Sequence, residues 1–262
     1  MRGLRSVVVP AALVAALLGG TVWAGGGARS RIFERELSAG ELSAVRVAAG
    51  NGKVTVVAHS EELVRVRLEA RPKRFTGDED RGPLGWFLTS RLDDEQELLR
   101  TISLDEEVEH GALALRLLPR GRSRESRIEE TWLLEVPSRF AVELSASSAE
   151  VGVTGVAGGV RLRQGHGSAT VDVPGGALDL ALDVGRLEAR SGAPDWQRVA
   201  LRSQVGDTRL VLDGRRVREP KPPGPGSQVT LEGRGTEILE LRVQVGDAVL
   251  RLEEESHRAS GR

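Results

Sequence analysis

A twelve-residue stretch recurs near the C-terminal end of the chain. Leu201–Leu212, "LRSQVGDTRLVL", returns 40 residues later as Leu241–Leu252, "LRVQVGDAVLRL", with the letters QVGD intact. Apolar and polar residues alternate with period two in both copies, and the alternation reverses its phase across the Gly-Asp pair. This pattern is typical of two half-buried strands joined by a sharp corner. The repeat therefore predicts an all-β chain that bends at fixed places.

The same phase reversal can be traced at six places. The corners are Gly52-Lys53, Ala149-Glu150, Gly167-Ser168, Gly185-Arg186, Gly206-Asp207 and Gly246-Asp247. Successive corners from 149 to 206 lie 18, 18 and 21 residues apart, and the 40 residues from 206 to 246 equal two repeats of about 20, with a missing corner near Gly226. One such repeat, here called a rung, cannot bury its own apolar face, so rungs must stack. We expect a right-handed β-solenoid or β-helix-like stack of about 20-residue rungs.

Glycine at the corners indicates a structural turn. Sharp turns require positive φ, which glycine adopts at little steric cost, so we expect a turn role for Gly52, Gly167, Gly185, Gly206 and Gly246. The residue before each glycine, such as Val205, is predicted to point into the core, as are Ser203 before it and Thr208 after it. The residue after the glycine varies between acid, base and hydroxyl. A structural corner explains the repeat better than a duplicated active site does.

The first 24 residues are typical of a secretory signal peptide. Arg2 and Arg5 supply a positive start, Val7–Leu18 forms an apolar stretch, and small residues at Val22 and Ala24 fit cleavage after Ala24. The alternative is an uncleaved N-terminal anchor, through which alone the chain would meet a membrane, because the apolar run to Ala24 could barely span one. In both cases we expect an exported protein of the periplasm, cell envelope or cell surface.

The remaining chain is predicted to form one domain. We expect a flexible lead at 25–41, a single β domain at 42–253 and a disordered tail at 254–262. Two interruptions stand out because alternation fails there: an insertion at 71–100, where Ser90–Arg100 is the one credible helix, and a Pro-rich loop at 219–226. Four further strands are expected at Val45–Val57, Glu62–Ala70, Gly111–Pro119 and Thr131–Pro137.

The array of corners resembles a known family. The segments "NGKVTVV", "WLLEVPSRFAVELSASSAEVGVTGVAGGVRL" and "LALDVGRLEARSG" are similar to the bacterial putative-adhesin family of β-strand-repeat domains, over Leu42 to Glu253. The resemblance implies an exported, non-enzymatic β-solenoid, and it carries over no catalytic residue. The chain departs from the family at Arg71–Arg100 and Glu219–Gly226, where a specific function could have been added.

The sequence gives little support for a catalytic or metal-binding site. Asp207 and Asp247 could be paired carboxylates of a glycan-cleaving β-helix, but two rungs would separate them by about 9.6 Å, and acidic residues after a corner glycine stabilise turns. A calcium ladder would need an acid in every rung, and a zinc site would need converging ligands that the four dispersed histidines do not offer. His166 stands directly before its corner glycine, as Val184, Val205 and Val245 do before theirs. It is expected either to cap the core row or to turn to solvent. We expect no enzyme activity, no metal and no cofactor.

Composition narrows the range of partners. The chain has 37 basic and 38 acidic residues, so nucleic acid is not an expected partner, and its lack of cysteine excludes disulfides. Among few aromatic residues, Trp86 and Phe87 are candidate partner contacts, or else a cap over an open end of the stack. We expect a non-catalytic envelope or surface module for structure or adhesion that binds a protein or glycan. The alternatives are a polysaccharide-acting β-helix enzyme and an envelope-stress sensing partner.

Overall fold

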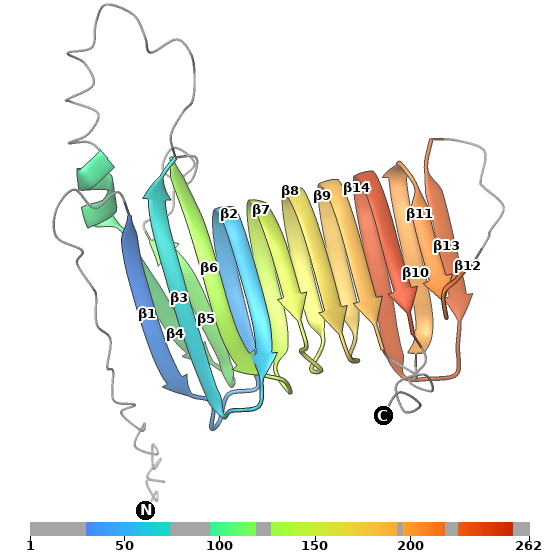
Figure 1. Cartoon of the computed structure of the whole chain (residues 1–262), viewed down its shortest axis with the longest axis horizontal. Helices are drawn as coiled ribbons and strands as arrows, with labels where there is room; N and C mark the ends of the chain where they lie inside the picture. Colours follow the sequence, from blue (N-terminus) through green and yellow to red (C-terminus); the bar gives the residue numbers. More distant parts are fainter. Residues whose placement is uncertain (1–29, 74–94, 119–126, 193–195, 218–224, 254–262) are drawn as a thin grey trace, which may run out of the picture.

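The computed structural model describes residues 30–73, 95–118, 127–192, 196–217 and 225–253. These residues form fourteen strands and one helix over residues 95–101, which confirms the predicted all-β class (Figure 1). None of the described residues belongs to a helix with the length and hydrophobicity to cross a membrane. The strands are β1 (Arg31–Ser38), β2 (Ala44–His59), β3 (Leu63–Pro72), β4 (Ser103–Glu109), β5 (Ala112–Leu118), β6 (Ile128–Pro137), β7 (Ala141–Thr154), β8 (Val160–Val173), β9 (Leu178–Ser191), β10 (Trp196–Val205), β11 (Thr208–Leu212), β12 (Arg215–Val217), β13 (Ser227–Glu232) and β14 (Glu237–Leu252).

All fourteen strands belong to one open sheet. Along its main path the order is β1-β3-β6-β2-β7-β8-β9-β14-β10-β13 (Figure 1). Pairing is parallel from β2 through β7, β8, β9 and β14 to β10, whereas β1 with β3 and β10 with β13 are antiparallel. Parallel neighbours in the middle are what repeated passes in one direction produce.

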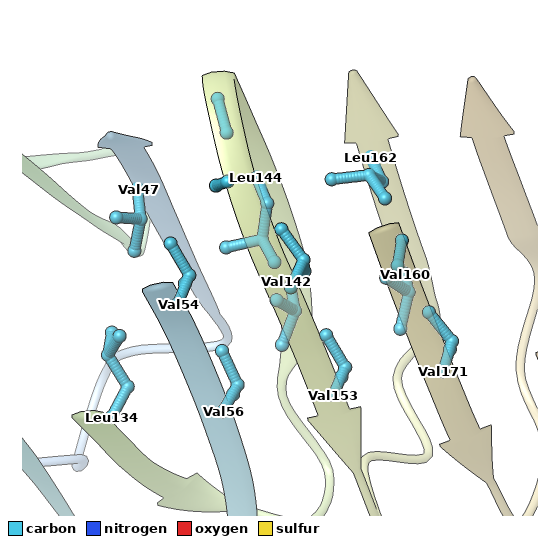
Figure 2. Packing of buried hydrophobic residues seen from close by; sticks show 14 of the residues in the cluster. Val47, Val54, Val56, Leu134, Val142, Leu144, Val153, Val160, Leu162 and Val171 are labelled. Atoms are coloured by element: carbon cyan, nitrogen blue, oxygen red, sulfur yellow. The ribbon is translucent and has the colours of Figure 1, made fainter. Parts of the chain in front are cut away.

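The long strands bend, and each contributes to two layers of the sheet. The first part of β2, Ala44–Ala48, pairs with β5, and its second part, Asn51–His59, pairs with β6. Both parts pair with β7. Side chains from before and after the bend therefore meet in one interior, where Val47 and Val54 of β2 lie near Leu144 and Val153 of β7 (Figure 2). This shared apolar interior is what a single rung could not form by itself.

The corners stack in register. Gly52 lies opposite Ala149, Ala149 opposite Gly167, Gly167 opposite Gly185, and Gly185 opposite Gly246. The five corner glycines have φ values of 128°, 122°, 142°, 138° and 132° in chain order, a region that other residues rarely adopt. A Cβ on Gly185 would overlap the carbonyl oxygen of Gly167. Glycine is needed there both for the backbone conformation and for the close approach of the neighbouring rung.

The order of the last rungs corrects the prediction from spacing. β14 lies between β9 and β10, so the corner at Gly246 is next to the corner at Gly206 instead of two rungs away. No corner occurs at Gly226, because β13 begins at Ser227 and runs antiparallel to β10. The spacing of 40 residues gives only the length of chain between two corners. It does not determine which strand inserts between which neighbours.

The N-terminal end of the sheet is covered by part of the insertion. Leu98, Leu99 and Ile102, in and just after the helix, are buried against the core. The Arg31 Nη1 group donates to the backbone oxygens of Leu99, Arg100 and Ile102 at 2.9, 3.1 and 2.6 Å, which satisfies carbonyls at the helix C-terminus. Arg31 begins β1, so the expectation of a flexible lead throughout 25–41 was wrong over Arg31–Ser38. Period-two alternation is present in β1, but it is short and highly charged.

We predict that Gly185→Ala lowers the free energy of unfolding by about 1–3 kcal/mol, because the added Cβ meets both positive φ and the Gly167 carbonyl. Gly152→Ala is the matched control, since a Cβ at that strand position meets nothing within 4 Å. Urea denaturation of both variants and the parent measures the difference. Equal stability of the two variants would contradict the role of the corner glycine.

Candidate interaction surface

The bends place one row of side chains along an edge of the sheet, which we call the corner edge. It consists of the residue directly before each corner in six neighbouring rungs. In spatial order these residues are Asn51, Ser148, His166, Val184, Val245 and Val205. The row is polar in its N-terminal half and apolar in its C-terminal half. It differs from the buried rows because five of its members are exposed and Asn51 is half-buried.

The exposure of this row corrects a second prediction. Val184, Val245 and Val205 are 40%, 46% and 48% exposed, although alternation placed the residue before the glycine inside. In β10 the last inward side chain is Ser203, which is 3% exposed, and both Gln204 and Val205 are exposed. The chain has therefore begun to turn before it reaches the glycine. His166, in the same row, also faces solvent and does not cap the core.

Buried polar side chains satisfy the backbone beneath the corners. Ser203 Oγ donates to the Gly246 oxygen at 2.8 Å, and Gln164 Nε2 donates to the backbone oxygens of Ala149 and His166 at 2.5 and 2.8 Å. Buried carbonyls that lack a donor cost free energy, so these side chains stabilise the bend. Alternation predicted Ser203 in the interior but gave no reason for a polar residue there. The corner carbonyl supplies that reason.

A hollow of about 900 Å³ lies at the N-terminal half of the corner edge, and we call it the corner hollow. Its lining combines the corners of β2, β7 and β8 and the end of β3 with Ser30 before β1, Glu129 of β6 and Glu95 of the helix. Its lining is mostly polar or charged. The lining residues are Ser30, Asn51, Gly52, Arg71, Pro72, Lys73, Glu95, Glu129, Ser148, Ala149, Glu150, Gly167 and Ser168.

Charges of both signs border the corner hollow. Arg71 Nη2 lies 2.7 Å from Glu69 Oε1, and Lys53 Nζ lies 3.0 Å from Glu150 Oε1. Burial by itself would raise the pKa of Glu69, but its hydrogen bonds from Arg71 and Ser30 and the positive charges of Arg71 and Arg67 hold that pKa below its ordinary value. The rim therefore offers charged donors and acceptors together. Such a lining suits a hydrated, hydroxyl-rich or zwitterionic ligand better than an apolar one.

The sequence between two of the lining residues carries Trp86 and Phe87. Both residues lie outside the described part of the chain, and so do Ser90 and most of the Pro-rich loop. The last described residue before them, Lys73, and the first after them, Glu95, both line the corner hollow. The candidate partner contacts thus belong to an insertion anchored at this site.

Asp207 and Asp247 form a turn contact at the other end of the corner edge. They follow the glycines of neighbouring rungs, and the Asp207 backbone N–H donates to Asp247 Oδ1 at 3.1 Å. Both side chains are exposed. The expectation that two rungs separate these carboxylates was wrong, because their rungs are neighbours. A carboxylate that accepts a hydrogen bond from a nearby backbone amide stabilises a turn. Within the described ranges, no three His, Asp or Glu residues are grouped so that they could hold a metal ion.

The outer faces of the sheet carry ladders of ion pairs. Asp179 is the centre of one, with Arg163 Nη2 at 2.5 Å and Arg242 Nη2 at 2.9 Å from its carboxylate. Burial by itself would raise the pKa of Asp179, but hydrogen bonds and charges from Arg163 and Arg242 hold it below its ordinary value. These arginines come from β8 and β14, on either side of β9. They join neighbouring rungs on the outer face.

Comparison with known proteins gives similarity only at the level of solved structures. No family model and no curated protein matches the chain. A putative cell adhesion protein from Clostridium sporogenes ATCC 15579 is 15% identical with a TM-score of 0.49, over 86% of this chain and 100% of that one. A putative adhesin from Parabacteroides merdae ATCC 43184 is 8% identical with a TM-score of 0.21, over 85% and 95% of the two chains. A putative lipid binding protein from Parabacteroides distasonis ATCC 8503 is 9% identical with a TM-score of 0.21, over 84% and 96%.

We predict that Asp179→Asn lowers the free energy of unfolding by about 0.5–1 kcal/mol at pH 7, because the two arginines lose their shared anion. The folded-state pKa is depressed, so this contribution is present above the unfolded-state value and is lost as the pH falls through the folded-state value. The gap between parent and variant should close below about pH 4. Denaturation curves across pH 2–7 measure it, and a gap that widens toward acid would contradict the assignment.

Proposed function

We propose that the protein is an exported, non-catalytic module of the cell envelope or surface that binds a protein or glycan partner at the corner hollow. One observation carries the proposal: a hollow of about 900 Å³ with a mixed-charge lining includes both Lys73 and Glu95, the described residues on either side of the insertion segment. Binding residues concentrate on segments that a rigid scaffold positions. The hollow and the insertion together have this arrangement.

The scaffold proposed for this site is a right-handed β-solenoid-like stack. Its support is the parallel pairing of β7, β8, β9 and β14, with their corners in register. A stack of this kind holds surface residues at fixed intervals of about 4.8 Å. It can therefore present a partner with an extended and rigid surface.

Export rests on the N-terminal sequence. Arg2, Arg5 and the apolar run Val7–Leu18 fit a signal peptide, with cleavage after Ala24 or retention as an anchor. The partner would then meet the domain outside the cytoplasm. Sensing of envelope stress through such a partner would use the same surface.

The first test fills the hollow. Ser168→Arg places a long side chain in its lining, and Thr170→Arg is the matched control, two residues further along the same strand and outside the lining. The mature domain and both variants are immobilised and exposed to envelope fractions and to a glycan array. We expect Ser168→Arg to lose most of the retained partner or glycan, and Thr170→Arg to keep it.

A second variant examines the insertion. Trp86→Ala with Phe87→Ala should weaken the same interaction by about tenfold or more, because exposed rings in a loop often anchor a partner. Retention by parent and Ser168→Arg in equal amounts would contradict the hollow as the site. A non-catalytic role would be contradicted if the parent cleaved a glycan and Asp207→Ala, with its fold intact, did not.

A further inference from the structure

A row of polar side chains crosses four neighbouring strands in the lining of the corner hollow, and we call it the polar row. It consists of Arg71 of β3, Glu129 of β6, Asn51 of β2 and Ser148 of β7, each opposite the next in register. Register partners on neighbouring strands project from the same face of a sheet. At about 4.8 Å per strand, the row extends for about 14 Å across the strands. The hollow therefore offers hydrogen-bonding groups at a regular interval.

The charges of the described lining nearly cancel. It holds two basic and three acidic residues. One of each sign already has a partner, because Arg71 pairs with Glu69 and Glu150 pairs with Lys53. Among the described lining residues, one ammonium group, that of Lys73, then remains for two carboxylates. A polyanion would meet more repulsion than attraction here, so an uncharged ligand fits better.

The lining differs from the centre of a protein interface. Among the described lining residues, the apolar ones are Pro72, Ala149 and two glycines, whereas large aromatic and aliphatic side chains anchor most protein partners. An extended peptide cannot add as a strand here either, because β3, β6, β2 and β7 each already have a strand on both sides. Recognition at the polar row therefore depends on side-chain hydrogen bonds.

A chain of sugars satisfies these conditions. Sugar hydroxyls both donate and accept hydrogen bonds, so they pair with the guanidinium, carboxylate, amide and hydroxyl groups of the polar row alike. In an extended chain of pyranoses, each sugar adds a length close to the spacing between strands. Neighbouring sugars can therefore meet neighbouring side chains of the row.

We propose that the ligand of the corner hollow is an uncharged glycan chain that lies across the strands along the polar row. This inference rests on the proposed function, since it assigns a ligand class to the same site. The Glu129 carboxylate accepts hydrogen bonds from the hydroxyls of one sugar, and such charge-assisted bonds are stronger than neutral ones. Asn51 and Ser148 bind the sugars that follow along the chain.

The test compares soluble sugar chains of equal length by calorimetry. The probes are the hexamers of β-1,4-linked glucose, mannose and N-acetylglucosamine, which are uncharged, and the hexamer of galacturonic acid, which carries a carboxylate on every sugar. We expect at least one uncharged hexamer to bind about tenfold or more tightly than the galacturonate hexamer. No binding of any uncharged hexamer up to millimolar concentration would overturn the inference. Binding of the galacturonate hexamer that is at least as tight would also overturn it.

Two substitutions test the position of the chain on the polar row. Glu129→Ala should weaken binding of the uncharged hexamer by about tenfold or more, and Ser148→Ala by about fivefold, because each removes a hydrogen-bonding group. Ser145→Ala is the matched control, the same change at an exposed position of the same strand outside the hollow. Denaturation curves establish that the variants are folded. Equal effects of Ser148→Ala and Ser145→Ala would overturn the polar row as the binding surface.

Failure of this inference differs from failure of the proposed function. If Ser168→Arg loses an envelope partner that protease treatment destroys, the corner hollow stands as the site and the glycan is overturned. If Ser168→Arg retains the partner as the parent does, the site itself is wrong, and the inference fails with it.

Discussion

The structure depends on the close approach of backbones at the corners. At five of the six corners a glycine occupies a place where a Cβ would collide with the neighbouring backbone, as between Gly185 and the oxygen of Gly167. Ala149, at the corner of β7, is the exception, and its rung still stacks in register against Gly52 and Gly167. Because the corner fixes the spacing, it also fixes the register of every side chain before and after it. The buried rows of Figure 2 follow from that register.

The same bend determines what faces outward. The chain turns before it reaches the glycine, so two consecutive residues leave the core, and the second of them forms the corner edge. Asn51 and Ser148, in the first two rungs, line the corner hollow, while valines in the last three rungs form an apolar line. The ion pairs around Asp179 lie instead on an outer face, where they join neighbouring strands. The corner edge therefore changes from polar to apolar along the stack, and the proposed partner site lies at its polar half.

Much of this arrangement could be predicted from the sequence. The phase reversal located the bends, since side chains of a strand alternate between faces. Two strands were expected at each bend, but at five of the six corners one bent strand runs through, and only β10 and β11 are separate. The phase reversal could not locate β14 between β9 and β10, because a parallel stack accepts any neighbour whose corner is in register. Val205 was misplaced because alternation was extended to the glycine, whereas Gln204 and Val205 are both exposed at the end of β10. The corner hollow had no local sequence signal, since its residues come from seven separate segments.

Disulfide trapping of neighbouring rungs tests the central claim, that corners stack in register with β14 between β9 and β10. Arg190 and Arg251 are opposite one another, and Val211 lies one strand further on. A pair one strand apart, about 4.8 Å, permits a disulfide, and a pair two strands apart does not. In dilute protein, Arg190→Cys with Arg251→Cys should form an intramolecular disulfide, and Arg190→Cys with Val211→Cys should stay reduced. A disulfide between 190 and 211 without one between 190 and 251 would contradict the account.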